Sequence, residues 1–422
     1  MHTQSSKLPN GERLLLTPIA DAKSITVFVT VPHGSRHETR EQSGLAHFYE
    51  HMVFKGAKKY PTAADISQAL DRYGSEYNAF TDTEQTAFYA KIAADHADVA
   101  LDVISDYLQY ATIDQEELDR ERGVILEELK MYWDLPDQRA MMQIGPVIFG
   151  DTAVGRSVGG DPECVKRFTR DDFIAWRDAM YRADAVVISV AGAIPGDFAA
   201  RIETAFGALP QGTTQLKPEP AQLITAGPTI KIDVRDGDQT QLVLGFPGCS
   251  IADEDRWTQR VLRTIMGVSM SSRLFTQIRE RRGLCYSIRM IDQILTDTGM
   301  IAVTAGLDSA RLAEALPAIA HELHQIAHEA PSADELERAK EFIKGSTTLS
   351  LEDSSAIAQL KANQLMYEGK LFTLEERFAQ IDAVTAEGVR AMAERLFTLD
   401  RLGLVLVGPK VDEAAVRDWL QL

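Results

Sequence analysis

A short segment near the start of the chain carries two histidines and a glutamate at a spacing that suits metal chemistry. His47, Glu50 and His51 lie within Gly44–Gly56, which reads GLAHFYEHMVFKG. On an α-helix, residues four apart stand above one another on one face, so the two imidazoles could hold one cation. Glu50 would sit beside that face, where it could take a proton from a water molecule without itself binding the cation.

The residues around this segment predict the helix that the histidine pair needs. Ser43 is a residue type that caps a helix at its amino end, Lys55 suits the carboxyl end, and Gly56 can close the helix. The alternative is an exposed helix whose histidines are simply hydrated. Apolar residues at positions 45–46 and 52–54 argue against it, because burying polar groups without partners is costly.

The order H-x-x-E-H is the reverse of the commoner zinc motif H-E-x-x-H. A catalytic zinc normally takes three protein ligands and keeps one position open, so a third ligand must come from another segment. A helix predicted from Asp114 onward offers Glu121 and Glu128, which are two turns apart on one face. One of these carboxylates could bind the metal while the other orients an imidazole.

The chain contains an internal repeat. The segment that begins at Thr169 aligns without a gap to the segment that begins at Thr385, an offset of 216 residues. Each copy reads as a capped helix, a turn and an apolar strand that ends in glycine. The stretch Pro210–Pro220 lies between the copies and has the Pro, Gly and Thr content of a linker. We therefore predict two homologous domains, 1–212 and 225–422.

The order of elements in each half indicates the fold class. Strand-like runs precede pairs of helices, which favours an α+β fold over a doubly wound parallel sheet. We expect two α/β-sandwich domains, each a mainly antiparallel sheet packed with helices. At an offset of 218, Ala339 and Ser346 stand where the first half has Glu121 and Glu128, and no histidine occurs in 256–267. The second domain is therefore expected to be metal-free.

Composition disfavours several classes of partner. The chain has 422 residues and a formal net charge of −18, which disfavours binding to nucleic acid or to anionic membrane surfaces. The longest apolar stretches fall well short of the roughly 20 residues that cross a bilayer. Residues 1–10 carry no export or organelle signal, and the three cysteines are scattered. We expect a cytoplasmic protein with reduced thiols, and no nucleic-acid or membrane partner.

These motifs, together with LPNG at 8–11, resemble the M16 peptidases, the inverted-zincin family of pitrilysin, insulin-degrading enzyme and the mitochondrial processing peptidases. The resemblance covers essentially the whole chain and is greatest to the short, bacterial, processing-peptidase-like subfamily. It implies an M16 peptidase-like fold and one Zn²⁺ per chain. It also implies roles for individual residues: His47, His51 and Glu128 as zinc ligands, Glu50 as the general base, and Glu121 as a support for the site.

The second half resembles the family's Arg/Tyr segment over 271–286, SSRLFTQIRERRGLCY. The resemblance implies that Arg279 and Tyr286 contact the bound peptide and help to stabilise the oxyanion. A guanidinium and a phenol are suitable donors to a carbonyl oxygen that gains charge. Without the resemblance, a surface arginine and a core tyrosine would be the simpler interpretation.

A strand-like run after Gly74 contains Asn78, Ala79 and Phe80. In the family this strand lies along the cleft, and its backbone binds the substrate as an added strand. Such binding depends on the extended shape of the peptide more than on its sequence. The resemblance therefore implies a substrate-binding role for these three residues. The alternative for Asn78 is an ordinary turn residue.

The resemblance implies a zinc-dependent endopeptidase that hydrolyses unfolded peptides or presequence-like segments inside a clamshell of two halves. Because this chain resembles one half and carries both the zinc motif and the Arg/Tyr segment, it implies a homodimer. The alternatives are a heterodimer with an unlike M16 subunit, or a catalytically silent scaffold or assembly subunit. The intact zinc set argues against a scaffold.

A second group of histidines has a simpler interpretation. His321, His324 and His328 fall on one predicted helix, and the last two have the spacing of metal ligands. No glutamate lies between those two, and no carboxylate helix is at hand to complete a site. We therefore expect a hydrated helix face.

Overall fold

The computed structural model describes residues 2–212, 214, 218–224 and 227–420. The chain forms two compact units, which are treated separately below. Unit 1 comprises Met1–Leu129, Arg156–Glu219 and Thr348–Phe372, and unit 2 comprises Lys130–Gly155, Pro220–Thr347 and Thr373–Leu422. The units differ from the linear division at 1–212 and 225–422 because Lys130–Gly155 and Thr348–Phe372 each lie in the unit of the other half. Parts of the predicted linker, residues 213 and 215–217, and the positions 225–226 lie outside the described residues.

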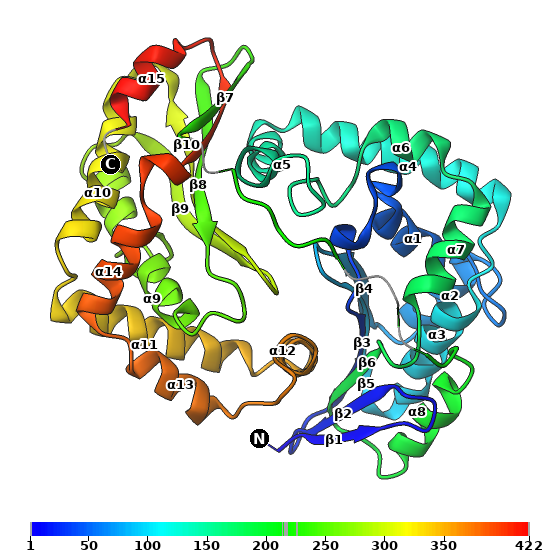
Figure 1. The fold of residues 1–422 in the computed structure, drawn as a ribbon. Coiled ribbons are helices and arrows are strands. Elements are labelled where there is room, and N and C mark those ends of the chain that lie inside the picture. Colours follow the sequence, from blue (N-terminus) through cyan, green and yellow to red (C-terminus); the bar gives the residue numbers. More distant parts are fainter. Residues whose placement is uncertain (1, 213, 215–217, 225–226, 421–422) are drawn as a thin grey trace. The chain divides into compact units, whose positions relative to one another are not determined.

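Unit 1 is built on a mixed sheet (Figure 1). Within the described residues it has six strands in the order β1-β2-β6-β3-β5-β4, and only the β2–β6 pair is parallel. The strands are β1 (Gln4–Lys7), β2 (Arg13–Pro18), β3 (Ser24–Val31), β4 (Glu76–Thr81), β5 (Thr86–Ala93) and β6 (Val187–Gly192). The α-helices are α1 (Leu45–Val53), α2 (Ala63–Asp71), α3 (Ala97–Tyr110), the first part of α4 (Gln115–Asp134), α6 (Pro162–Arg167), α7 (Arg170–Met180), α8 (Phe198–Phe206) and α12 (Ser354–Glu368).

The central strand β3 shows why this sheet needs cover on both faces. Its residues alternate as a strand requires, and Ile25, Val27 and Val29 enter the large core under α1 and α3. Phe28 points the other way, into a smaller core that includes residues of α12. Thr26 also faces α12, and its hydroxyl lies 2.8 Å from that of Ser354. A helix from the second half of the sequence therefore completes the burial of the first sheet.

Unit 2 repeats the arrangement. Within the described residues its sheet has five strands in the order β7-β11-β8-β10-β9, and only the β7–β11 pair is parallel. The strands are β7 (Thr229–Val234), β8 (Gln239–Gly248), β9 (Cys285–Ile294), β10 (Gly299–Asp308) and β11 (Gly403–Gly408). The helices are α5 (Pro136–Phe149), α9 (Arg256–Gly267), the π-helix η4 (Phe275–Glu280), α10 (Leu312–His328), α11 (Ala333–Ser350), α13 (Leu374–Asp382), α14 (Ala386–Leu396) and α15 (Glu413–Trp419). The predicted α+β class with mainly antiparallel sheets is confirmed.

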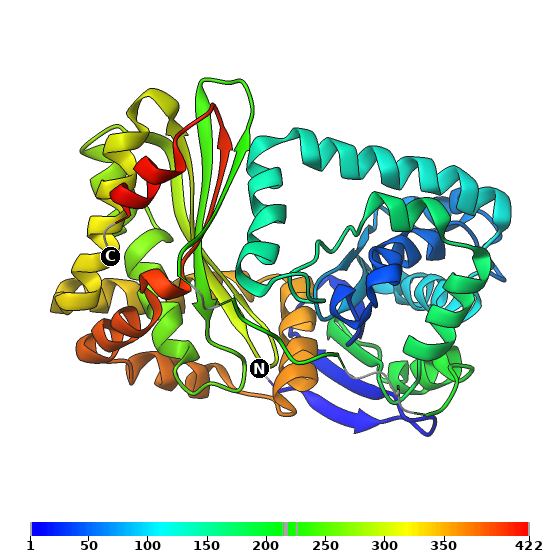
Figure 2. The ribbon, with the colours of Figure 1, turned by 45° about the horizontal axis from the view of Figure 1, so that its top comes forward.

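Helix α5, from the first half of the sequence, packs on the sheet of unit 2 and runs beside its strands (Figure 2). The close fit depends on glycines. A Cβ at Gly245 of β8 would lie 2.8 Å from a side-chain carbon of Ile148, and one at Gly403 of β11 would lie 2.9 Å from another. Helices α5 and α12 occupy matching places in the repeat, since an offset of 218 relates Pro136 to Ser354. Each thus packs on the sheet of the other sequence half.

The repeated segments are the helix–strand pairs α7–β6 and α14–β11. Thr169 and Thr385 are the N-cap residues of the two helices, as predicted, and Gly192 and Gly408 end the two strands. None of the helices among the described residues combines the length and the apolar character needed to cross a membrane.

Two buried histidines of unit 1 are expected to lower the stability of the folded protein at acid pH. Burial lowers the pKa of His33 to about 3, with a further contribution from His37, and burial lowers that of His37 to about 4. The folded state therefore holds both rings neutral, whereas the unfolded chain protonates them near pH 6.5. Stability from this source is complete above pH 6.5 and falls as the pH drops towards 4, by about 1.4 kcal/mol per pH unit for each histidine.

Urea unfolding between pH 7 and pH 4.5, with a chelator present, measures this effect. We expect the free energy of unfolding of a His33→Gln variant to depend less steeply on pH than that of the parent, by about 1.4 kcal/mol per unit below pH 6.5. Parallel pH profiles for parent and variant would contradict the assignment of the effect to His33.

Candidate metal centre

Helix α1 presents both histidines on one face. Phe48, Tyr49 and Met52 are fully buried in the core of unit 1 and hold the opposite side of the helix. The rings of His47 and His51 are 4.8 Å apart between centroids, and both side chains keep partial exposure, 15% and 24%. The four-residue spacing thus leaves two imidazoles available at the surface of a helix that is otherwise packed.

The amino end of α1 is stabilised differently from the prediction. Ser43 does not cap the helix, because the N-cap residue is Gly44, which has a left-handed backbone and no capping side chain. The buried carboxylate of Glu38 accepts hydrogen bonds from the backbone N–H groups of Gly44 and Ala46, at 2.9 and 2.7 Å. It takes the place of a local cap, and these hydrogen bonds oppose the burial that raises the pKa of Glu38 to about 8.

Gly44 is required by close packing as well as by its backbone. Its φ is +96°, and an added Cβ would lie 2.8 Å from the carbonyl oxygen of Gly159 and 3.0 Å from the Cα of Gly160. Gly159 and Gly160, at the end of a glycine-rich stretch that lacks the ending of a phosphate-binding loop, therefore pack against the start of the histidine helix.

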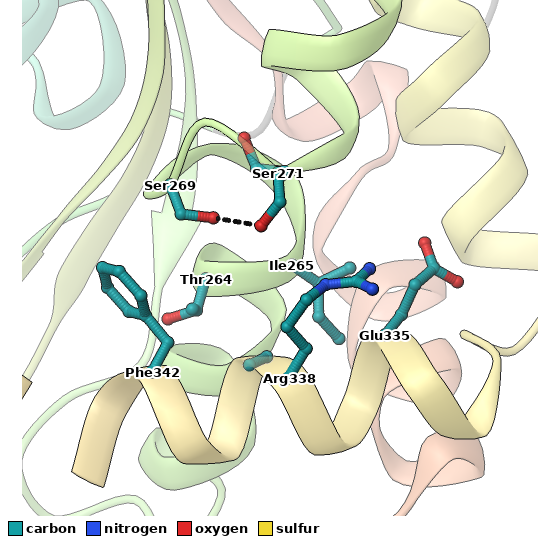
Figure 3. Close-up of a pocket in the computed structure, with 9 residues that line it drawn as sticks. Thr264, Ile265, Ser269, Ser271, Glu335, Arg338 and Phe342 are labelled. Atoms are coloured by element: carbon teal, nitrogen blue, oxygen red, sulfur yellow. Dashed lines mark hydrogen bonds between the residues drawn. The ribbon is translucent and has the colours of Figure 1, made fainter. Parts of the chain in front are cut away.

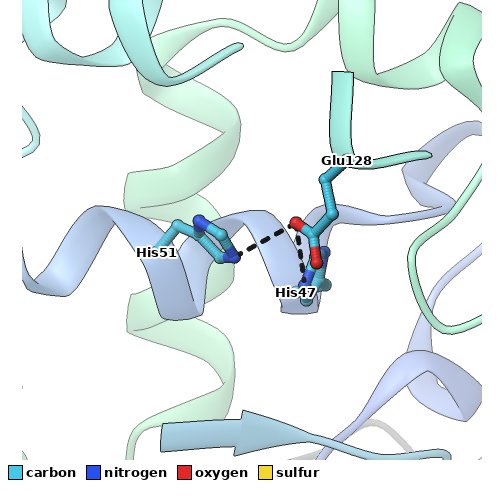
Figure 4. A group of neighbouring side chains, drawn as sticks. All are labelled: His47, His51 and Glu128. Atoms are coloured by element: carbon cyan, nitrogen blue, oxygen red, sulfur yellow. Dashed lines mark ion pairs between the residues drawn. The ribbon is translucent and has the colours of Figure 1, made fainter. Parts of the chain in front are cut away.

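Helix α4 brings the third group to the pair. Asp114 accepts hydrogen bonds from the N–H groups of Glu116 and Glu117 at 2.9 and 3.1 Å, so it caps α4 as predicted. Glu128 Oε2 lies 3.9 Å from His47 Nε2 and 3.7 Å from His51 Nε2 (Figure 4). Among the described residues, these three form a group whose ligand atoms all lie within 4.8 Å of one another.

The donor set and its spacing fit zinc. Donors about 2.0–2.1 Å from a tetrahedral zinc lie roughly 3.3–3.4 Å apart, a little less than the 3.7 and 3.9 Å between Glu128 Oε2 and the two imidazole nitrogens. Two imidazole nitrogens and one carboxylate oxygen, with a remaining open position, make up the ligand set of a catalytic zinc site. All three side chains are partly exposed, so a substrate oxygen could reach the open position.

Glu121 lies beside this group and orients one of its rings. His51 Nδ1 donates to Glu121 Oε1 at 2.9 Å, which leaves the Nε2 lone pair of His51 facing Glu128. The other oxygen of Glu121 pairs with Lys55 Nζ at 2.5 Å. Lys55 therefore supports the candidate metal site. The sequence suggested a role for Lys55 at the carboxyl end of α1, but the C-cap residue of that helix is Phe54.

The surroundings set the protonation of these groups. Burial, with a smaller contribution from the neighbouring His51, lowers the pKa of His47 to about 4, so His47 is neutral at pH 7 as a metal ligand must be. Burial raises the pKa of Glu121, but hydrogen bonds from His51 and Lys55 outweigh it, and the net shift is downward. Glu121 is therefore an anion that accepts from the imidazole.

Glu50 lies beside the metal group and is held from another strand. Its side chain is buried, and burial raises its pKa while a hydrogen bond from Thr81 opposes that rise. Thr81 Oγ1 on β4 donates to Glu50 Oε2 at 2.6 Å. A raised pKa is the usual device by which a carboxylate becomes a better proton acceptor near neutral pH.

The three predicted substrate residues lie on β4, the edge strand of the sheet in unit 1. Ala79 is buried in the same core as α1, whereas Phe80 points to the opposite face and contacts the core that includes α12. Asn78 Oδ1 accepts the N–H of Ala79 at 2.9 Å. Because β4 is an edge strand, the side of its backbone that faces away from β5 is the part that an added strand would pair with.

Arg279 and Tyr286 lie in unit 2, on η4 and β9. The guanidinium carbon of Arg279 lies 5.4 Å from the centre of the Tyr286 ring and 4.6 Å from that of Phe275. Tyr286 is 79% exposed, so its phenol is available to another molecule. The structure therefore brings the predicted pair together, seven residues apart in the sequence.

A pocket of unit 2 contains the position that corresponds to Glu121 in the repeat (Figure 3). Ala339, the counterpart of Glu121, lines it beside Phe342, together with Thr264, Ile265, Ser269, Ser271, Ser272, Glu335 and Arg338. The lining contains no histidine. On α10, the rings of His324 and His328 stack 3.9 Å apart, and neither belongs to a metal-type group of three among the described residues.

Three residues at the site were missed by sequence reasoning: Glu38, Lys55 as a partner of Glu121, and Thr81. Glu38 and Thr81 lie 6 or more residues from what they contact, so no local pattern marks them. For Lys55, its place one turn after His51 is a usable signal, because both then lie near the same face as Glu121.

A helical pair of histidines completed by a carboxylate from a second helix defines a candidate zinc site on a duplicated α+β fold. Family models match the chain at residues 14–161, "Insulinase (Peptidase family M16)", and at 167–343, "Peptidase M16 inactive domain". The chain therefore belongs to peptidase family M16.

Similar proteins agree with this membership. An uncharacterized zinc protease of Bacillus subtilis is 35% identical over 400 residues, which cover 95% of this chain and 97% of that protein. The probable mitochondrial-processing peptidase subunit beta of Arabidopsis thaliana is 30% identical, with 97% of this chain and 79% of that protein covered. A solved M16 inactive domain from Pseudomonas fluorescens has a TM-score of 0.89 at 20% identity, with 97% and 98% of the two chains covered. A protease structure from Helicobacter pylori has the same TM-score and identity, with 97% and 99% covered.

Proposed function

We propose that this protein is a zinc-dependent endopeptidase that hydrolyses unfolded peptides or presequence-like segments. The observation that carries the proposal is the convergence of His47, His51 and Glu128 from two helices, with Glu50 beside them. The names of its relatives, which include zinc proteases from several bacteria, support it. We further propose one Zn²⁺ per chain, held by these three ligands in unit 1, and a cytoplasmic location.

The chain's own residues account for the steps of hydrolysis. A bound zinc would polarise the scissile carbonyl and lower the pKa of a water molecule. Glu50 accepts the proton of the attacking water and delivers it to the leaving nitrogen. Glu121 holds the imidazole of His51 in the tautomer that binds a metal.

The substrate is proposed to bind as an extended strand along β4, at Asn78, Ala79 and Phe80. An edge strand offers backbone groups to any extended peptide, so recognition depends on unfolded conformation more than on sequence. Arg279 and Tyr286 are proposed to contact the peptide and the developing oxyanion. Native globular proteins, which lack a free extended segment, are expected to be poor substrates.

The working unit is proposed to be a homodimer that forms a clamshell, in which the Arg279/Tyr286 pair of one subunit serves the zinc site of the other. Mixing Glu50→Gln and Arg279→Ala subunits tests this arrangement. If the Arg279/Tyr286 pair acts on the zinc site of the other subunit, each mixed dimer recovers up to one active site. Activity of the mixture no higher than that of either variant alone would reject this arrangement. A heterodimer with a related subunit is the alternative, which the similarity to a mitochondrial-processing peptidase subunit favours.

A catalytically silent scaffold is the second candidate function. It is favoured only by the family's inactive domains, one of which matches residues 167–343. Scaffolding places no demand on three converging metal-type ligands or on an acid held beside them.

Digestion of a mixed library of unfolded peptides, read by mass spectrometry, tests the proposed function. We expect cleavage by the zinc-loaded protein, loss of cleavage with a chelator, and recovery when zinc is restored. Cleavage that persists at full rate in the chelated protein, or no cleavage by the zinc-loaded protein, would refute it.

A further inference from the structure

The side chain of Glu50 needs a restraint that its own helix does not supply. A glutamate has three rotatable side-chain bonds, and a carboxylate that must take a proton at one place loses efficiency if it samples several orientations. In the structure, Thr81 supplies such a restraint from outside α1, and its Oγ1 lies 2.6 Å from Glu50 Oε2. The contact joins the edge strand β4 to the helix that carries the two histidines.

The hydroxyl of Thr81 is itself directed by its neighbours. Thr81 pairs with Thr86 across the β4–β5 ladder, and their hydroxyl oxygens are 3.4 Å apart. Thr86 donates its proton to the carbonyl oxygen of His33 at 2.9 Å, so Thr86 cannot donate to Thr81 at the same time. Thr81 carries a single proton, and its 2.6 Å contact with the Glu50 carboxylate is shorter than its 3.4 Å contact with Thr86, so Glu50 is the acceptor that takes this proton. Because Thr is β-branched, its χ1 is also restricted in a strand.

The position of Thr81 in the strand adds a second link. It follows directly after Asn78, Ala79 and Phe80, the residues proposed to receive the peptide. Alternation along the strand puts the side chains of Ala79 and Thr81 on the same face, towards α1. One strand would thus place both the peptide backbone and the acid that acts on it.

We propose that Thr81 is a positioning residue for Glu50: its hydroxyl binds Oε2 of the carboxylate, so that Oε1 is the oxygen left to accept the proton of the attacking water. The proposal rests on the proposed peptidase function. It assigns no direct contact with zinc to Thr81, and therefore separates the placing of the acid from the holding of the metal.

Three variants test the proposal in the full-length, zinc-loaded protein. Thr81→Val keeps the shape and removes the hydroxyl, Thr81→Ser keeps the hydroxyl, and Thr26→Val is a matched control. Thr26 is a buried strand threonine of the same unit whose hydroxyl contacts Ser354 and does not contact α1. The readouts are kcat and KM for a cleaved peptide and the Kd for zinc.

We expect Thr81→Val to lower kcat by roughly 30-fold, within the range of effects seen for misplaced acid–base groups. KM and the zinc Kd should change less than threefold. Thr81→Ser should recover kcat to within about threefold of the parent, and Thr26→Val should leave kcat unchanged. An unchanged kcat in Thr81→Val, a loss that Ser does not recover, or a parallel loss of zinc affinity would each overturn the proposal.

The contact between Thr81 and Glu50 can also be tested by a measurement that does not depend on enzymatic activity. A double-mutant cycle of Thr81→Val and Glu50→Leu, which removes both carboxylate oxygens, should show a coupling of about tenfold in the unfolding equilibrium constant of the zinc-free protein. Additive effects would overturn the contact. If the zinc-loaded parent is inactive, the proposed peptidase function is refuted, and with it any catalytic role of Thr81. If the parent is active and Thr81→Val is equally active, only this inference about Thr81 is refuted.

Discussion

Glu50→Gln is expected to lower kcat for peptide hydrolysis by about a thousandfold while the protein keeps its zinc. Glutamine matches glutamate in shape but cannot accept a proton at neutral pH, and general acid–base groups typically contribute 10²–10⁴ to a rate. Glu50 is not among the three proposed ligands, so the zinc Kd should stay within a few-fold of the parent value. Steady-state kinetics on one cleaved peptide, with zinc content measured on the same samples, give both numbers.

The comparison of rate and metal content makes this prediction specific. A variant that lost activity only because the site collapsed would also lose zinc. A kcat within threefold of the parent would show that another group accepts the proton, and the proposed role of Glu50 would be wrong.

Glu128→Gln is expected to lower zinc affinity by more than 100-fold and to reduce peptide hydrolysis to background. The carboxylate supplies both the negative charge and the third donor atom, 3.7 and 3.9 Å from the two imidazole nitrogens. Losing a group that only supports a ligand already costs 10–100-fold in metal affinity, so loss of a ligand should cost more. Competition with a chromogenic chelator measures the Kd.

Glu127→Gln provides the matched control. Glu127 precedes Glu128 on α4 and is exposed, and its side chain leaves the helix about 100° away. We expect its zinc affinity and kcat to equal those of the parent. Equal zinc affinity in the Glu128 and Glu127 variants would exclude Glu128 as the third ligand.

Much of the metal centre follows from helical spacing. His47 and His51 share a face because four residues make about one turn, and Glu121 and Glu128 share a face because seven residues make about two. Only the resemblance to the M16 family implied that the histidine face and the glutamate face meet. The distances that join them arise from tertiary packing of α1 and α4 on one core.

The supports of the site were less predictable, because they come from distant segments. Ser43 has the right type for a cap, yet the buried carboxylate of Glu38 satisfies the same N–H groups from outside the helix. Phe80 was grouped with Asn78 and Ala79 by its place in a motif. The two-residue period of a strand sends its side chain away from α1, to the other face of the sheet.

The repeat predicted the common architecture of the two halves but not the exchange of α5 and α12. Both helices have apolar residues suited to a sheet face, and nothing local distinguishes one sheet from the other. For α5, the choice of sheet depends on two glycines, Gly245 and Gly403, which leave room for Ile148 on the sheet of unit 2. Such complementarity links positions about 100 and 250 residues apart in the sequence.

The central claim is that three side chains from two helices bind one zinc ion. Anomalous diffraction at the zinc absorption edge, from crystals of the zinc-loaded protein, tests it most directly. The account predicts one peak per chain in unit 1, about 2.0–2.2 Å from His47 Nε2, His51 Nε2 and a carboxylate oxygen of Glu128. A peak bound elsewhere in the chain, or none at these residues in protein that contains stoichiometric zinc, would contradict it.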